Sequence, residues 1–196
     1  MNNVMKSRIL ILLVSVSSLF SVQVATSQNY ILNNSSSTLE VQGTSSLHDW
    51  TLETEDQSGK LVLAEGDAFN ISTLNLTVVA ESLKSGKSAM DKNTYKALKT
   101  DDHKTMLFNL VSVNEIKTVS ATSYKVSVSG KMTIAGVTKT ISVDLTANLQ
   151  GSNVILEGKK TFKMTDFGID PPKALLGTIK TGDDITIVFK STFNKQ

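Results

Sequence analysis

Apolar and polar residues alternate along most of the chain beyond residue 38. The segments Leu74-Asn75-Leu76-Thr77-Val78 and Ile141-Ser142-Val143-Asp144-Leu145-Thr146 show this clearly. Because successive side chains of a β-strand point to opposite faces of a sheet, each such segment has one apolar and one polar face. The pattern predicts eight or nine strands, over residues 38–43, 50–55, 60–64, 69–80, 106–116, 123–135, 139–150, 153–165 and 184–193.

Clusters of Gly, Asn and Asp punctuate these predicted strands and indicate short turns. They include Gly43, Ser58-Gly59, Glu65-Gly66-Asp67, Gly130, Gly136, Gly151-Ser152-Asn153 and Thr181-Gly182-Asp183-Asp184, the last of which we interpret as a hairpin turn. The polar residues 28–37 are expected to be a loose lead-in. Many strands with short connections predict an all-β antiparallel barrel or sandwich. The barrel is favoured because a closed sheet has no exposed edges.

One segment, residues 88–100, breaks the alternation. Its Ala, Met, Tyr and Leu residues favour a helix, and their spacing suits one or two turns. We therefore predict one short helix on a long mid-chain connection, over residues 84–104. The adjacent Pro171 and Pro172 are expected in a loop between the last two strands, where proline interrupts no ladder.

The first 27 residues have the pattern of a secretory signal peptide. Lys6 and Arg8 precede an apolar run, Ile9 to Phe20, and the small residues Ala25-Thr26-Ser27 follow it. The run is short for a membrane span, which needs about 20 apolar residues, although an uncleaved anchor is the alternative. No cysteine follows that could carry a lipid. We predict cleavage after Ser27, a barrel domain over residues 28–196, and a periplasmic or secreted protein.

Charge and cysteine content exclude several classes of partner and chemistry. Removing Lys6 and Arg8 from the 20 basic residues leaves 18, equal to the 18 acidic residues. The remaining chain contains no arginine and so lacks the planar group that pairs with phosphates. This argues against nucleic acid and against docking on an anionic membrane. With no cysteine, disulfides, thiolate metal sites and cysteine nucleophiles are absent.

Two polar clusters could carry chemistry. His48 and Asp49 are adjacent, so on a strand they point to opposite faces and do not form a dyad, and no triad partner is evident. We interpret them as a polar turn before Trp50, which would anchor the core or a cavity. His103, beside Asp101 and Asp102, could join a metal site but fits a solvated loop better. We therefore predict no catalytic residue, no metal and no cofactor.

The inward-facing apolar residues are the candidate ligand site. A barrel of about eight strands can leave room for one small ligand. Few aromatic residues are available, so the walls of Leu, Ile, Val and Met would suit a flexible hydrocarbon chain. A packed core uses the same residue types and is the alternative. The candidates are Trp50, Phe69, Leu74, Leu76, Val78, Phe108, Leu110, Val126, Val128, Ile141, Val143, Phe162, Ile185 and Ile187.

Four segments, taken in order, resemble the YceI-like family of exported bacterial proteins. They are Gly43–Trp50, Ser82–Lys87 leading into Met90-Asp91-Lys92 and Leu98-Lys99, Gly130–Lys139, and Met164–Ile169. The resemblance implies a lipocalin-like, eight-stranded antiparallel barrel that binds a polyisoprenoid or quinone-type lipid in a long apolar cavity. It implies no enzymatic mechanism. Arginine is frequent in the family where this chain has Met90 and Met164, so contacts made by those arginines are not carried over.

Three functional hypotheses follow. The first is extracytoplasmic binding, transport or sequestration of an apolar chain molecule, a polyisoprenoid, quinone-type or fatty-acyl lipid, with the loops 84–104 and 166–180 flanking or gating the mouth. The second is a ligand-free, stress-protective or protein-interaction barrel. The third is a hydrolase or isomerase that uses one of the two histidines. Membrane insertion is not expected, and whether the protein is a homodimer stays open.

Overall fold

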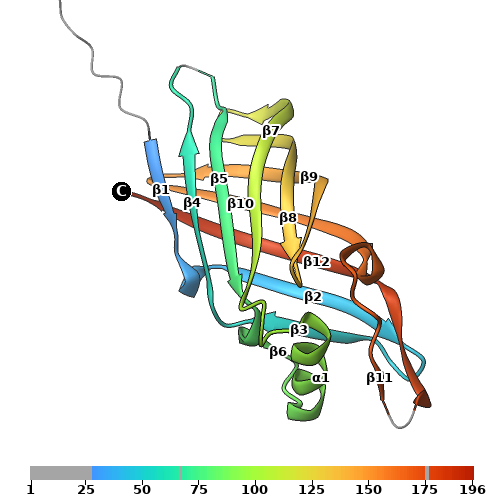
Figure 1. The fold of residues 1–196 in the computed structure, drawn as a ribbon. Coiled ribbons are helices and arrows are strands. Elements are labelled where there is room, and N and C mark those ends of the chain that lie inside the picture. Colours follow the sequence, from blue (N-terminus) through green and yellow to red (C-terminus); the bar gives the residue numbers. More distant parts are fainter. Residues whose placement is uncertain (1–27, 67, 175–176) are drawn as a thin grey trace, which may run out of the picture.

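The fold is an antiparallel β-barrel with one short helix at its lower end (Figure 1). The computed structural model describes residues 28–66, 68–174 and 177–196, so the predicted signal peptide lies outside the described residues. The strands are β1 (Gln28–Leu32), β2 (Thr38–Ser45), β3 (Trp50–Thr54), β4 (Gln57–Leu63), β5 (Ile71–Val79), β6 (Leu83–Lys84), β7 (Thr105–Ser120), β8 (Ser123–Ile134), β9 (Val137–Gln150), β10 (Asn153–Lys163), β11 (Lys173–Ala174) and β12 (Ile179–Lys195), and the helix is α1 (Ser88–Leu98).

Eight strands form the closed barrel. The order is β1-β4-β5-β7-β8-β9-β10-β12, and β12 pairs back to β1. The long strand β12 also pairs with β2, which pairs with β3, which pairs with β6. The pairs β1 and β2, β4 and β3, and β5 and β6 therefore act as three strands that bend partway along the barrel. The predicted all-β, eight-stranded antiparallel barrel with one short helix is confirmed.

Polar side chains hold the bend together. Asn34 lies in a 3-10 turn between β1 and β2, and its Nδ2 donates to the Glu55 carbonyl at 3.0 Å. Its Oδ1 accepts from the Gln57 N–H at 3.0 Å. On the other side, Thr192 Oγ1 of β12 donates to the Ser36 carbonyl at 2.8 Å. The bend is thus a specific structure, and it separates an upper half of the barrel from a lower half that ends at α1.

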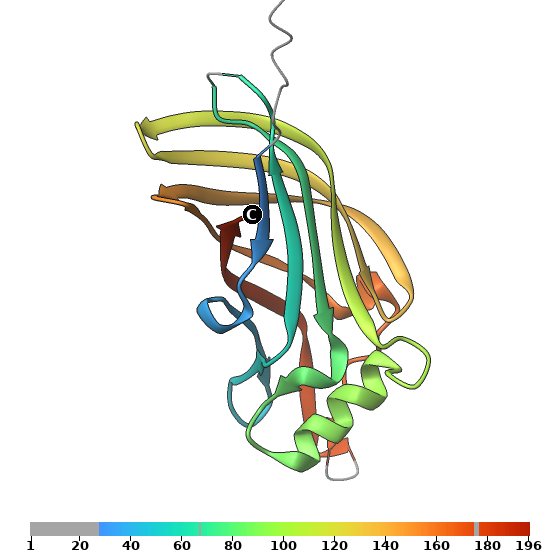
Figure 2. The ribbon, with the colours of Figure 1, turned by 90° about the vertical axis from the view of Figure 1, so that its left-hand side faces the viewer.

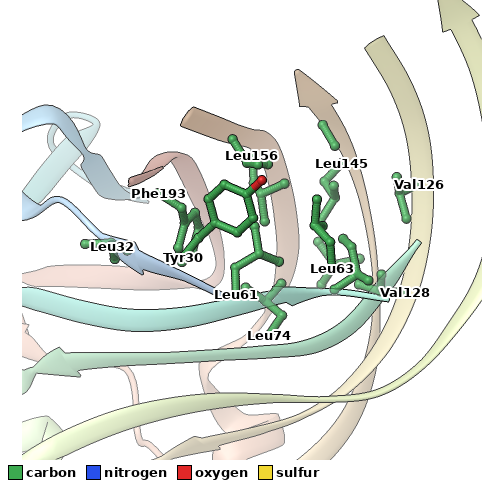
Figure 3. Packing of buried hydrophobic residues seen from close by; sticks show 14 of the residues in the cluster. Tyr30, Leu32, Leu61, Leu63, Leu74, Val126, Val128, Leu145, Leu156 and Phe193 are labelled. Carbon is green, nitrogen blue, oxygen red and sulfur yellow. The ribbon is translucent and has the colours of Figure 1, made fainter. Parts of the chain in front are cut away.

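The upper half is filled by a cluster of buried side chains that we call the upper core (Figure 3). Leu61, Val128 and Phe193 in it have 0% exposure. Burying a side chain of this size contributes about 1.5–3 kcal/mol. At its end Phe69 stacks on Tyr124, with ring centroids 4.3 Å apart. The upper end of the barrel is therefore closed by packing.

Strand β1 corrects the prediction of a loose lead-in over residues 28–37. Tyr30 pairs with Lys195 of β12 and with Leu61 of β4, so β1 closes the barrel. Tyr30 and Leu32 point into the upper core, where they are 6% and 7% exposed. The alternation does not reveal this strand because only these two side chains carry its apolar face, and the polar residues that follow them form the 3-10 turn.

The lower half is covered by α1 and by loops (Figure 2). The helix was predicted over residues 88–100 with one or two turns. The observed helix has 11 residues, about three turns. It ends at Lys99, whose φ of 53° is left-handed. Leu98 of α1 joins a second buried cluster with Val41, Leu83 and Phe167.

Several predicted turns are wrong because the glycines lie inside strands. Gly43, Gly59, Gly130 and Gly182 fall within β2, β4, β8 and β12. A Cβ on Gly43 would overlap the Trp50 ring, and one on Gly130 would overlap the Phe108 ring. These two glycines make room for aromatic rings that lie flat against the sheet.

The predicted hairpin turn at Thr181–Asp184 is also wrong. It lies in β12, where the pairing with β2 shifts register between Thr181 and Ile185. Asp183 accepts hydrogen bonds there from the Thr165 N–H (2.9 Å) and Oγ1 (2.7 Å). These bonds lower the pKa of the Asp183 carboxyl. Pro171 and Pro172 lie between β10 and β12 as predicted, followed by the unpredicted short strand β11.

Candidate ligand-binding cavity

The barrel interior holds two chambers. The upper chamber has a volume of about 100 Å³ and the lower chamber about 330 Å³. Val41, Met106, Ile134 and Ile187 line both, and we call these four residues the neck. The chambers therefore meet at the neck, which lies just below the bend.

The upper chamber has apolar walls apart from two side chains. Lys160 and Ser191 are its only polar lining residues among those described. Its apolar lining is Leu39, Val41, Leu74, Leu76, Val78, Met106, Leu107, Phe108, Val128, Met132, Ile134, Val143, Leu145, Leu156, Ile187 and Phe189. Lys160 faces inward because it pairs with Ile187 in the register of β10 and β12. A lysine at such a position lays its methylenes along an apolar wall.

The lower chamber is apolar inside and polar at its mouth. Trp50, Leu52 and Ile185 come from strands, and Met90 and Leu98 come from α1. Residues 89, 90, 93, 94, 97 and 98 all line it, which is one face of a helix. The polar lining residues are Ser45, His48, Lys87, Asn93, Thr94, Lys173 and Thr181.

Hydrogen bonds hold α1 over this chamber. Tyr95 Oη donates to the carbonyls of Glu81 (2.9 Å) and Leu83 (3.0 Å). Lys84 Nζ donates to Tyr95 Oη at 2.7 Å, and this bond raises the pKa of Lys84. Asp91, in the first turn, accepts from Ser85 Oγ at 2.6 Å. The helix is thus held at both its start and its middle.

Most of the predicted cavity residues line a chamber. Leu74, Leu76, Val78, Phe108, Val128 and Val143 line the upper chamber, Trp50 and Ile185 the lower one, and Ile187 both. Phe69, Leu110, Val126, Ile141 and Phe162 line neither of the two. Phe69 stacks on Tyr124, Phe162 packs edge-on against Phe167, Val126 is buried in the upper core, and Leu110 and Ile141 pack against buried clusters. Whether any of these side chains binds a ligand stays a prediction.

Sequence reasoning missed two groups of lining residues. The first group lies on predicted strands, at positions whose side chains face inward. Extending the alternation along each strand would have found these residues, which are Leu39, Val41, Met132, Ile134, Leu145 and Leu156. Met90, Leu98, Met164 and Ile169 belong to α1 and to the loop after β10. Met164 follows Phe162 at inward parity in the predicted strand 153–165, whereas no strand pattern points to Met90, Leu98 or Ile169. Met90 and Met164 thus lie in the same chamber.

The histidines do not gather with carboxylates. His48 Nδ1 lies 2.7 Å from the Asp49 carbonyl oxygen, so it contacts the backbone of Asp49. His103 lies against Gly136 at the end of the loop after α1. Among the residues that the structure describes, no group of three or more His, Asp or Glu side chains could hold a metal ion.

The fold and the site define a β-barrel with an apolar interior cavity that opens beside a helix. A YceI-like domain model matches residues 30–193, a range that includes all or most of every barrel strand. The chain belongs to the YceI-like family. No curated protein matches it. In the described part of the chain, no helix is long and apolar enough to cross a membrane.

Several solved structures share this fold. BcnA of Burkholderia cenocepacia is 15% identical, with a TM-score of 0.66 over 82% of this chain and 98% of its own. A polyisoprenoid-binding domain from Saccharophagus degradans, implicated in plant cell wall breakdown, is 14% identical, with a TM-score of 0.67 over 85% and 98%. The Campylobacter jejuni YCEI protein is 17% identical, with a TM-score of 0.56 over 73% and 82%. At such low sequence identities, the structural similarity establishes a shared fold alone.

Proposed function

We propose that this protein binds an apolar chain molecule, such as a polyisoprenoid, a quinone-type lipid or a fatty-acyl lipid, and carries or sequesters it outside the cytoplasm. The observation behind the proposal is an apolar path from the lower chamber through the neck into the upper chamber. Membership in the YceI-like family and the polyisoprenoid-binding neighbour support it.

The shape of the path favours a flexible chain. Burying apolar surface contributes about 25 cal/mol per Å², or roughly 0.8 kcal/mol for each methylene. Association and chain ordering cost several kcal/mol, so a ligand needs many buried methylenes for useful affinity. Because the polar lining lies at the lower mouth, a polar head group would stay near His48 and Asn93 while its chain passes the neck.

Whether the purified protein carries a bound apolar molecule tests this proposal. Native mass spectrometry of protein from its own cells, followed by solvent extraction, should reveal a stoichiometric apolar ligand. Ligand-free protein should take up an offered isoprenoid alcohol or fatty acid. A clean apo mass with no uptake of either would contradict the proposal and favour a ligand-free interaction module.

We further propose that α1 and the loop that reaches β11 gate the mouth. Residues of both predicted flanking loops, including Met90 and Lys173, line the lower chamber. Tyr95→Phe removes the hydroxyl that ties α1 to Leu83 and should speed ligand exchange. Tyr124→Phe, which removes a hydroxyl at the upper end, should not. Equal exchange rates in the wild type and Tyr95→Phe would contradict gating by α1.

Export is also a proposal. All the barrel strands that the structure describes lie within residues 28–196, so removal of residues 1–27 would leave them in place. We expect the protein from extracytoplasmic fractions to begin at Gln28 by intact mass and N-terminal sequencing. Recovery of the uncleaved chain from the cytoplasm would contradict this.

A further inference from the structure

All four methionines in the described part of the chain line the chambers. Met106 lines both, Met132 the upper chamber, and Met90 and Met164 the lower chamber. They come from α1, β7, β8 and the 3-10 turn after β10, so no local bias in composition explains their meeting. Among the described residues, the buried members of the upper core include no methionine.

Methionine differs from the residues that form the rest of the walls. Its unbranched side chain has three rotatable bonds and a polarizable thioether, so it adapts to irregular shapes. Val and Ile are restricted at χ1 by their branched Cβ. At the neck, Met106 stands among Val41, Ile134 and Ile187, so one adaptable side chain stands among three stiff ones.

Three of the four methionines also have room to move. Met90, Met106 and Met132 are only half-buried, whereas Met164 is 7% exposed. A half-buried methionine beside a cavity can change rotamer without displacing a packed neighbour. The neck can therefore widen at Met106 while its branched residues stay fixed.

We infer that the methionine walls make the cavity broadly specific, so that it accepts both linear and methyl-branched hydrocarbon chains, with Met106 adjusting the width of the neck. This inference rests on the proposed binding function. Flexible, methionine-rich surfaces are a general device for accepting varied ligands. A neck walled only by branched residues would discriminate against chains that carry methyl branches.

Two alcohols with chains of the same length test the inference. Hexadecan-1-ol is linear and saturated, whereas phytol carries four methyl branches and one double bond beside its hydroxyl end. The wild-type protein should bind both with dissociation constants within about tenfold of each other. Met106→Ile keeps the side chain apolar but stiffens it, and should weaken phytol binding relative to hexadecanol by about tenfold or more. Leu63→Ile, in the upper core, is the matched control and should leave the ratio unchanged.

Methyl-labelled methionine supplies a second measurement that does not depend on the variants. Binding of either alcohol should shift the methyl signals of Met90, Met106, Met132 and Met164. An unchanged phytol-to-hexadecanol ratio in Met106→Ile, or a wild-type preference above about a hundredfold, would overturn the inference while leaving the binding function intact. Failure of the wild-type protein to bind either alcohol would overturn the binding function and the inference together.

Discussion

The two halves of the barrel are built from the same alternating strands but differ in how completely their interiors are packed. Above the bend, the fully buried Leu61, Val128 and Phe193 pack the interior and leave a chamber of only about 100 Å³. Below it, Trp50 and Met90 are half-buried around a chamber of about 330 Å³. The upper half is enclosed by strands that continue past the bend, whereas the lower half is covered by a helix and loops. Alternation thus decides which side chains face inward, while the covering elements decide how much of the interior is filled.

The largest effect should come from truncating the upper core. Phe193→Ala removes a fully buried ring and should lower the free energy of unfolding by about 3–5 kcal/mol. Ile187→Ala at the neck should lower it by only about 1 kcal/mol, because Ile187 is half-buried and already borders a cavity. Urea unfolding of both variants measures the difference. Equal losses would mean that the two halves are packed alike.

Enlarging a side chain should have different consequences in the packed upper core and beside the upper chamber. Val126→Trp inserts a ring into the upper core and should destabilise the protein by about 1–3 kcal/mol. In Leu76→Trp the new ring would point into the upper chamber, so the variant should lose less stability. It should bind a hydrocarbon chain at least about tenfold more weakly than the wild type. Thermal unfolding and a ligand titration measure the two effects. A stable Leu76→Trp variant with wild-type affinity would contradict a ligand in the upper chamber.

The two glycine–aromatic contacts should respond unequally. Gly130→Ala meets the buried Phe108 and should cost about 1–3 kcal/mol of stability. Gly43→Ala meets Trp50, which is half-buried and can swing into the lower chamber, so it should cost about 1 kcal/mol or less. Since Trp50 is the only tryptophan, its emission should shift in Gly43→Ala and stay unchanged in Gly130→Ala. The reverse pattern would show that the lower wall is rigid.

The smallest effect concerns pH at the start of α1. Hydrogen bonds from Ser85 Oγ (2.6 Å) and N–H (2.8 Å) hold the pKa of Asp91 below its ordinary value of 3.8. Because the folded-state pKa is lowered, this carboxylate stabilises the fold above about pH 4, and the contribution is lost as the pH falls through the folded-state pKa. The upper core contains no such carboxylate among its buried residues, so acidification should loosen the helix first.

The Ser85 amide shift measures this effect. In the wild type this chemical shift should change with pH below about pH 4, as the Asp91 carboxylate is protonated. The same change should occur in the control Asp144→Asn, on the outer face of β9, and should be absent in Asp91→Asn. A titration that persists in Asp91→Asn would contradict the assignment.

The sequence predicts the main strands well because each is long and half-buried, as in Ile141–Thr146. It fails where the apolar face is reduced to one or two residues, as in β1, β6 and β11. It also fails where a glycine marks space for a ring, as at Gly43 and Gly130, because that signal depends on a partner from another strand. The upper-chamber residues follow from strand parity. In the lower chamber, strand parity accounts for Ile185 and Trp50 but not for Met90, Leu98 and Ile169. Those three meet only through the packing of a helix and a loop against the barrel end.

Magnetisation transfer between a bound hydrocarbon chain and the methyl groups of the barrel shows directly whether the chain enters the two chambers. With labelled Ile, Leu and Val methyls and bound hexadecan-1-ol, we expect contacts to Val41, Ile134 and Ile187 at the neck and none to Leu61 in the upper core. Contacts confined to the outer surface, or none at all under conditions where the alcohol is bound, would show that the chain does not enter the chambers and would contradict the account.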